Sequence, residues 1–260
     1  MPLDNNIKVS KAGRSYVLYD AGIITEPVLP LFNRDYHTNT GSQQNKSVSP
    51  TGEQASGGIG RAMVTYFTQG GKSYVLKHYY RGGLVASVLK DCYLGFSVLK
   101  SRAFREFRLL KKMQQSGLPV PVAVAAHACK GLFSYRADLI TEELQQAATL
   151  ADVLTMIKLG DQAWQGIGRC IKRFHQHDIY HADLNARNIL LTEQAGAGHD
   201  GIYLIDFDNS YIRLGSNSWK MANLSRLKRS LLKFKNNTDG FNFEEKNWDS
   251  LLAGYKADVV

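Results

Sequence analysis

The feature that most constrains this chain is an aspartate and an asparagine five positions apart, on one loop just before an apolar strand. These are Asp183 and Asn188, within the motif His-Ala-Asp-Leu-Asn-Ala-Arg-Asn. Asp206 follows eighteen residues after Asn188, at the end of a second apolar strand, residues 202–205. Phosphoryl transfer needs a carboxylate that orients the attacking hydroxyl and accepts its proton, and oxygen ligands for Mg²⁺ on the phosphates.

Each of these side chains fits one of those roles. Asp183 would act as the catalytic carboxylate, while Asn188 and Asp206 would hold Mg²⁺. A single Asp or Asn in a loop is usually a turn former or a helix cap. The ordered combination of loop, strand, turn and strand ending in Asp-Phe indicates ATP-dependent phosphoryl transfer instead.

The first half of the chain reads mainly as strands. Residues 61–67 and 73–80 flank a glycine-containing turn at residues 70–72 and predict a hairpin. Residues 101–115 predict a helix with an apolar stripe, ended by Gly117 and Pro119. Residues 33–56 are rich in Asn, Thr, Ser, Gln and Gly and predict a long, poorly ordered loop.

The second half reads mainly as helices. Residues 161–178 predict a helix whose buried side carries Trp164, Ile167, Ile171 and Phe174. The fold class that follows is α+β, with two lobes joined near residue 143. We expect a strand-rich nucleotide-binding lobe of residues 1–143 and a catalytic lobe of residues 144–260.

The loop and the second strand resemble the catalytic loop and the metal-binding Asp-Phe-Gly segment of protein-kinase-like enzymes. That resemblance implies the bilobal protein-kinase-like fold, with ATP and Mg²⁺ between the lobes. It also assigns nucleotide-binding roles to upstream residues. They are the strand lysine Lys77, its ion-pair partner Glu106, a phosphate-covering loop with Gly57, Gly58 and Gly60, and an adenine-binding hinge that includes Glu142 and Leu144.

Several departures from protein kinases narrow this expectation. The metal-binding triplet ends in Asp208 rather than Gly, and Ala182 replaces the arginine that usually receives an activation-loop phosphate. No Ala-Pro-Glu follows, and only about fifty residues remain. A reduced helical C-lobe favours a small-molecule or glycolipid acceptor over a peptide. The role of Asp208, in the metal site or at the acceptor, stays open.

Five further stretches resemble the bacterial 3-deoxy-D-manno-octulosonic acid (Kdo) kinase family, and the resemblance covers most of residues 57–235. It implies ATP-dependent phosphorylation of the 4-hydroxyl of a Kdo sugar on lipid A precursor, during lipopolysaccharide assembly. The stretches are residues 79–84, 101–107, 117–121, 180–185 and 205–208, and the tail of residues 219–231, with Asn223, Arg226 and Ser230, also fits.

Charge is unevenly distributed, and the formal net charge is +9. Residues 72–112 contain ten basic and two acidic side chains, and residues 220–235 contain six basic and none acidic. Such segments favour an anionic partner. With no transmembrane stretch or signal peptide in the sequence, we expect a cytoplasmic protein held peripherally on the inner membrane. Residues 79–102 would either contact lipid or acceptor or form an additional core helix.

Other functions remain open on sequence alone. An aminoglycoside-type kinase shares the loop, but the basic balance argues against a cationic acceptor. Thirteen tyrosines leave autophosphorylation possible. The intact catalytic residues argue against a pseudokinase scaffold, and no helix-turn-helix, zinc or aromatic RNA-binding signature supports nucleic-acid binding. The cysteines, Cys92, Cys129 and Cys170, fit reduced structural thiols.

Overall fold

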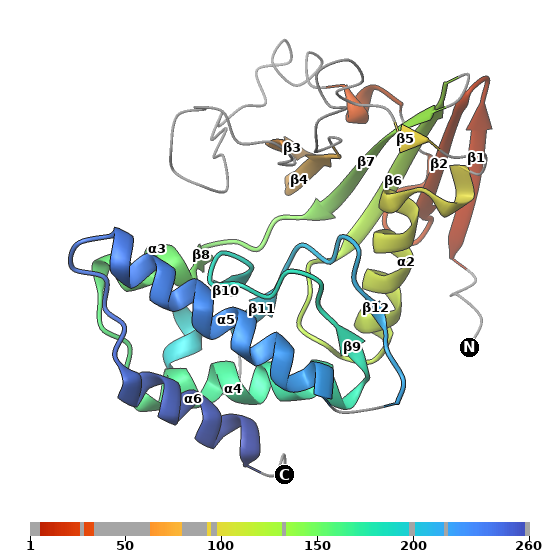
Figure 1. The fold of residues 1–260 in the computed structure, drawn as a ribbon. Helices are drawn as coiled ribbons and strands as arrows, with labels where there is room; N and C mark the ends of the chain where they lie inside the picture. Colours follow the sequence, from red (N-terminus) through yellow and green to blue (C-terminus); the bar gives the residue numbers. More distant parts are fainter. Residues whose placement is uncertain are drawn as a thin grey trace. The chain divides into compact units, whose positions relative to one another are not determined.

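The computed structural model describes residues 6–26, 29–33, 63–79, 93–94, 98–131, 134–197, 201–215 and 218–257. The chain divides into two compact units (Figure 1). The first contains an antiparallel sheet and the second is mainly helical, which confirms the predicted α+β class. Their bounds are Met1–Lys112 with Val122–Glu143, and Met113–Pro121 with Leu144–Val260.

The first unit is built on an antiparallel sheet in the order β1-β2-β6-β7-β4-β3, with β5 paired to the start of β7. One face of the sheet buries aromatic and aliphatic side chains from several strands. The strands are β1 (Ile7–Ala12), β2 (Ser15–Asp20), β3 (Met63–Gln69), β4 (Lys72–His78), β5 (Tyr93–Leu94), β6 (Ala123–Lys130) and β7 (Ser134–Glu142). Two 3-10 turns accompany them, η1 (Leu29–Phe32) and η3 (Val98–Lys100).

The hairpin of β3 and β4 places Lys77 on the sheet. Gly70 and Gly71 connect the strands with φ values of +57° and +75°. A two-residue turn with positive φ at both positions matches the twist of antiparallel strands, and glycine adopts it without a steric cost. Phe67 and Tyr74 then stack across the hairpin, with ring centroids 5.4 Å apart. The predicted hairpin is therefore confirmed.

Helix α2 (Arg102–Gln115) carries the predicted apolar stripe, and its side chains Phe104, Phe107 and Leu110 are buried. The last residues of α2 and the segment after it, residues 113–121, group with the second unit. Hydrogen bonds explain the grouping. The Leu204 N–H donates to the Pro119 carbonyl at 3.1 Å, and the Arg173 guanidinium donates to the Gly117 carbonyl at 2.6 Å.

The second unit surrounds two small antiparallel sheets with helices. One sheet has the order β11-β10-β8, and the other pairs β12 with β9. Its strands are β8 (Ala148–Thr149), β9 (Ile179–Tyr180), β10 (Ile189–Leu191), β11 (Ile202–Leu204) and β12 (Tyr211–Ile212). Its helices are α3 (Leu150–Met156), α4 (Asp161–Gln176), α5 (Ser218–Asn237) and α6 (Glu245–Lys256), with the 3-10 turn η4 (Glu193–Ala197).

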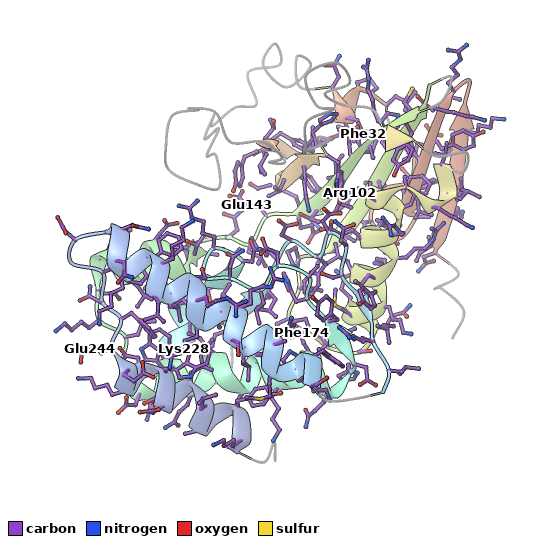
Figure 2. The ribbon with its side chains drawn as sticks, viewed as in Figure 1. Phe32, Arg102, Glu143, Phe174, Lys228 and Glu244 are labelled. Atoms are coloured by element: carbon purple, nitrogen blue, oxygen red, sulfur yellow. The ribbon has the colours of Figure 1, made fainter. Side chains whose placement is uncertain are left out.

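Helix α4 forms the centre of this unit. The four side chains predicted on its inner stripe are at most 1% exposed. One of them, Phe174 (Figure 2), stacks on Phe207 with ring centroids 5.7 Å apart. Helix α6 approaches α4 closely at two glycines. A β-carbon on Gly168 would lie 2.0 Å from the Leu251 carbonyl oxygen, and one on Gly254 would lie 2.1 Å from that of Gln165.

Two of the three cysteines lie in the described residues, and both are free thiols. Cys170 is buried on α4, and burial raises the pKa of its thiol to about 12. Among the described helices, none combines the length and the hydropathy that a bilayer span requires. Cys92, residues 34–56 of the predicted loop and most of residues 79–102 lie outside the described ranges.

Candidate active site

The loop of residues 181–188 connects β9 to β10 and carries the predicted catalytic aspartate. Pairing of β9 with β12, and of β10 with β8 and β11, fixes both ends of the loop. Between those ends, the side chains of Leu184 and Ala186 are fully buried. The Ala186 carbonyl accepts a hydrogen bond from the Ala151 N–H of α3 at 3.0 Å. The loop is therefore held at both ends and at Ala186.

His181 fixes the loop against the strand that precedes Asp206. Its Nδ1 accepts a hydrogen bond from the Asp183 N–H at 3.2 Å, and its Nε2 lies 3.0 Å from the Ile205 carbonyl oxygen. A carbonyl can only accept, so Nε2 carries the proton and the ring is the neutral tautomer. The ring also packs on Phe207, with centroids 4.7 Å apart. His181 therefore acts as a positioning residue.

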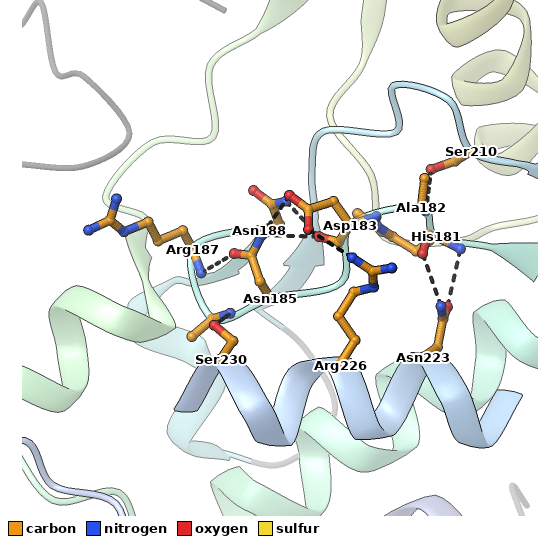
Figure 3. A network of polar contacts seen from close by, with 11 residues as sticks. His181, Ala182, Asp183, Asn185, Arg187, Asn188, Ser210, Asn223, Arg226 and Ser230 are labelled. Carbon is orange, nitrogen blue, oxygen red and sulfur yellow. Dashed lines mark hydrogen bonds and ion pairs between the residues drawn. The ribbon is translucent and has the colours of Figure 1, made fainter. Parts of the chain in front are cut away.

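Asp183 presents its carboxylate to solvent, with 61% of the side chain exposed. Asn185 Nδ2 donates to its Oδ2 at 3.0 Å, and Arg226 Nη1 lies 3.7 Å from its Oδ1 (Figure 3). Asn188 Nδ2 donates to the Asp183 carbonyl oxygen at 2.8 Å. The amide nitrogen of Asn188 is thus occupied by the backbone, which leaves Oδ1 as the atom that can bind a cation.

Asp206 follows β11 with a φ of +62°, in the left-handed region. That conformation is uncommon for a residue other than glycine and concentrates at functional sites. The Ile205 N–H donates to the Asn188 carbonyl at 3.0 Å, so the two predicted metal ligands lie on segments that are hydrogen-bonded to each other. The structure therefore brings the three predicted residues of this unit into one region.

Helix α5 holds the loop from the other side, a role that sequence reasoning missed. The Asn223 amide accepts from the His181 N–H at 3.2 Å and donates to the His181 carbonyl at 3.0 Å. Ser230 Oγ accepts from the Ala186 N–H at 3.2 Å (Figure 3). With Arg226, these side chains repeat every three to four residues along α5, the spacing of one helix face. This spacing of polar side chains is the sequence signal that could have identified the face of α5 that contacts the loop.

Lys77 and Glu106 form the predicted ion pair in the first unit. Lys77 Nζ lies 3.1 Å from Oε1 and 2.9 Å from Oε2 of Glu106, and the side chains are 14% and 4% exposed. Tyr79, which sequence reasoning did not assign to the site, donates to Glu106 Oε2 at 2.6 Å. Lys77 and Arg102 (Figure 2) both lie over the Tyr79 ring, at 4.8 and 5.6 Å from its centroid.

Some backbone groups of the predicted hinge already form hydrogen bonds within the first unit. The Glu142 N–H donates to Val122 and the Glu143 N–H donates to Ser73, each at 2.9 Å. The Glu142 side chain pairs with Lys72 at 3.0 Å. Adenine recognition here would therefore use the Glu142 carbonyl and the backbone of Leu144, and it stays a prediction. Gly57, Gly58 and Gly60 lie outside the described residues.

Comparisons with known proteins agree with this geometry. Residues 51–255 match the model of the lipopolysaccharide kinase (Kdo/WaaP) family. A 3-deoxy-D-manno-octulosonic acid kinase of Actinobacillus succinogenes is 42% identical over 198 residues, 74% of this chain and 81% of that protein. A protein of the same name from Vibrio vulnificus is 37% identical over 253 residues, 96% of this chain and 99% of that protein. The chain therefore belongs to the lipopolysaccharide kinase (Kdo/WaaP) family.

Proposed function

We propose that this protein is a Kdo kinase, which transfers the γ-phosphoryl group of ATP to the 4-hydroxyl of a Kdo sugar on lipid A precursor. The observation that carries the proposal is the exposed Asp183 carboxylate, oriented by Asn185 and set on a loop anchored at both ends. The names of the relatives supply the acceptor, since two of them carry this name at 37% and 42% identity.

Asp183 would orient the acceptor hydroxyl and take up its proton as the bond to phosphorus forms. Its carboxylate is exposed, so an acceptor can reach it from solvent, and Asn185 restricts its rotation. Phosphoryl transfer proceeds through a loose transition state, so the protein contributes mainly position and charge. His181 and Asn223 contribute by keeping the loop backbone fixed.

The second unit also provides oxygen donors for Mg²⁺. Asn188 has its amide nitrogen committed and its Oδ1 available, and Asp206 contributes a carboxylate. Mg²⁺ prefers oxygen ligands and usually keeps only one or two from the protein when phosphates supply others. The residues thus fit a magnesium ion, which when bound would neutralise charge on the phosphates.

Lys77 would contact the α- and β-phosphates of ATP. An ammonium group is a point charge on a flexible stem, and Glu106 and the Tyr79 ring restrict its position. Glu106 in turn is fixed by the Tyr79 hydroxyl. We include Glu142 and Leu144 as the adenine hinge, and Gly57, Gly58 and Gly60 as the phosphate-covering loop.

We also propose that the protein works at the cytoplasmic face of the inner membrane, because its acceptor is an anionic lipid. Helix α5 carries six basic and no acidic side chains, and two large apolar side chains on it, Met221 and Leu232, are 55% and 38% exposed. Each basic side chain near an anionic leaflet contributes about 1 kcal/mol to binding. Co-sedimentation with anionic and neutral vesicles tests this part separately.

The test is transfer of labelled phosphate from ATP to Kdo-bearing lipid A precursor in detergent micelles. Wild type should label the lipid and Asp183→Asn should lose most of the rate, while ATP binding, measured by calorimetry, persists. Asp239→Asn removes the same charge from an exposed turn and should behave as wild type. Labelling of another sugar or of the protein would discard the acceptor. Full turnover by Asp183→Asn would discard the catalytic assignment.

A further inference from the structure

Arg226 is a basic side chain of α5 that contacts the catalytic loop. It projects from the helix between Asn223 and Ser230, both of which hydrogen-bond the loop backbone (Figure 3). Its Nη1 lies 3.7 Å from Asp183 Oδ1. Two anchors on the same helix face, Asn223 and Ser230, therefore hold the part of α5 that carries Arg226 against the loop.

Among the residues that the structure describes, the contact with Asp183 involves one nitrogen of the Arg226 guanidinium. The Arg226 side chain is 42% exposed, and 3.7 Å is at the long end of an ion pair. Exposed pairs of this kind contribute little to stability. A guanidinium carries five N–H donors in a planar fork that matches a carboxylate. Arg226 can therefore accept a second anion, or exchange Asp183 for one, at small cost.

Resting on the proposed function, we infer that Arg226 binds the carboxylate of the acceptor sugar acid. The reacting hydroxyl must lie against Asp183, so the rest of the sugar ring lies within a few bonds of Arg226. In the ring form of a 3-deoxy-2-ulosonic acid, one methylene separates the carbon that bears the carboxylate from the carbon that bears the 4-hydroxyl. A group that touches one is adjacent to the other.

Electrostatics also favours Arg226 as the group that binds the acceptor carboxylate. An acceptor carboxylate that approaches Asp183 is a like charge, and like charges at close range raise the free energy of the complex. Arg226 is placed to offset that repulsion for an acid, and it offers nothing comparable to a neutral sugar. Arg226 thus makes the site selective for acceptors that carry a carboxylate beside the reacting hydroxyl.

The experiment compares two acceptors, Kdo-bearing lipid A precursor and the same lipid with the Kdo carboxylate reduced to an alcohol. Wild type should show a KM at least ~10-fold lower for the acid, the size of one hydrogen-bonded charge pair. Arg226→Ala should raise the KM for the acid to that of the alcohol, with kcat less affected. Arg226→Lys, which keeps the charge but loses the fork, should retain part of the preference.

The matched control is Arg229→Ala, which removes the same charge from an exposed position one turn along α5. It should change both KM values by the same factor and so keep the preference for the acid. A wild-type enzyme with no preference, or an Arg226→Ala variant that slows both acceptors equally, overturns the inference while the proposed function stands. A wild-type enzyme that phosphorylates neither acceptor overturns both.

Discussion

Replacing the Lys77–Glu106 pair separates its contribution to stability from its contribution to catalysis. The pair is almost desolvated, with side chains 14% and 4% exposed, and the Tyr79 hydroxyl also depends on Glu106. Removing one partner leaves a charge in a site of low dielectric. Lys77→Met or Glu106→Leu alone should therefore lower the free energy of unfolding by about 3–5 kcal/mol.

The double variant Lys77→Met/Glu106→Leu should behave differently. Replacing both partners by apolar side chains of similar volume removes the desolvation cost together with the attraction. The buried Tyr79 hydroxyl still loses its acceptor, so the double variant should lie about 1–3 kcal/mol below wild type, a smaller loss than that of either single variant. Its phosphate transfer should nevertheless fall, with a raised KM for ATP, because no ammonium remains for the phosphates. A folded and inactive protein is thus the expected result.

Equilibrium urea unfolding, followed by far-UV circular dichroism, and steady-state transfer assays on the same preparations give the two readouts. If each single variant costs less than about 1 kcal/mol, the pair behaves as a solvent-exposed ion pair and the reasoning is refuted. If the double variant transfers phosphate with the wild-type KM for ATP, Lys77 does not bind the phosphates.

Three further predictions follow from the second unit. Gly254→Ala should destabilise the protein by about 3 kcal/mol in urea unfolding, because the new methyl group meets the Gln165 backbone, whereas Gly160→Ala, with open space around the methyl group, should cost under about 1 kcal/mol. Burial lowers the pKa of His175 to about 4, so its neutral form contributes stability above about pH 6.5 that is lost as pH falls toward 4. Between pH 7 and 5 the free energy of unfolding should fall by about 2 kcal/mol. In His175→Gln, the urea midpoint should not show this part of the pH dependence. Asn223→Ala removes both hydrogen bonds to the His181 backbone and should lower kcat at least ~10-fold with little change in the KM for ATP, whereas an unchanged kcat would show that α5 does not position the loop.

Sequence patterns predicted those features that depend on local chemistry. The β3–β4 hairpin follows from two consecutive glycines between apolar strands, and the buried face of α4 follows from its helical spacing. The Lys77–Glu106 pair was predicted through resemblance, and the structure brings the two side chains together. In each case, a short stretch of sequence or a known motif carries the information.

Features that depend on tertiary contacts could not be predicted in the same way. Tyr79 reads as one of several strand tyrosines, and only the position of α2 places its hydroxyl on Glu106. Asn223 and Ser230 belong to the tail that resembles the family, but their role could not be predicted because nothing in the sequence states which loop α5 covers. The grouping of residues 113–121 with the second unit likewise depends on hydrogen bonds to distant segments.

The hydrogen bonds between α5 and the loop also have a consequence for biosynthesis. They join residues 42 and 44 positions apart, with Asn223 and Ser230 on the later segment. A chain emerging from the ribosome therefore exposes the whole catalytic motif well before the groups that organise it are available. Because contacts of high sequence separation form late, the nascent polypeptide should become competent for catalysis only after α5 has been translated and released from the tunnel.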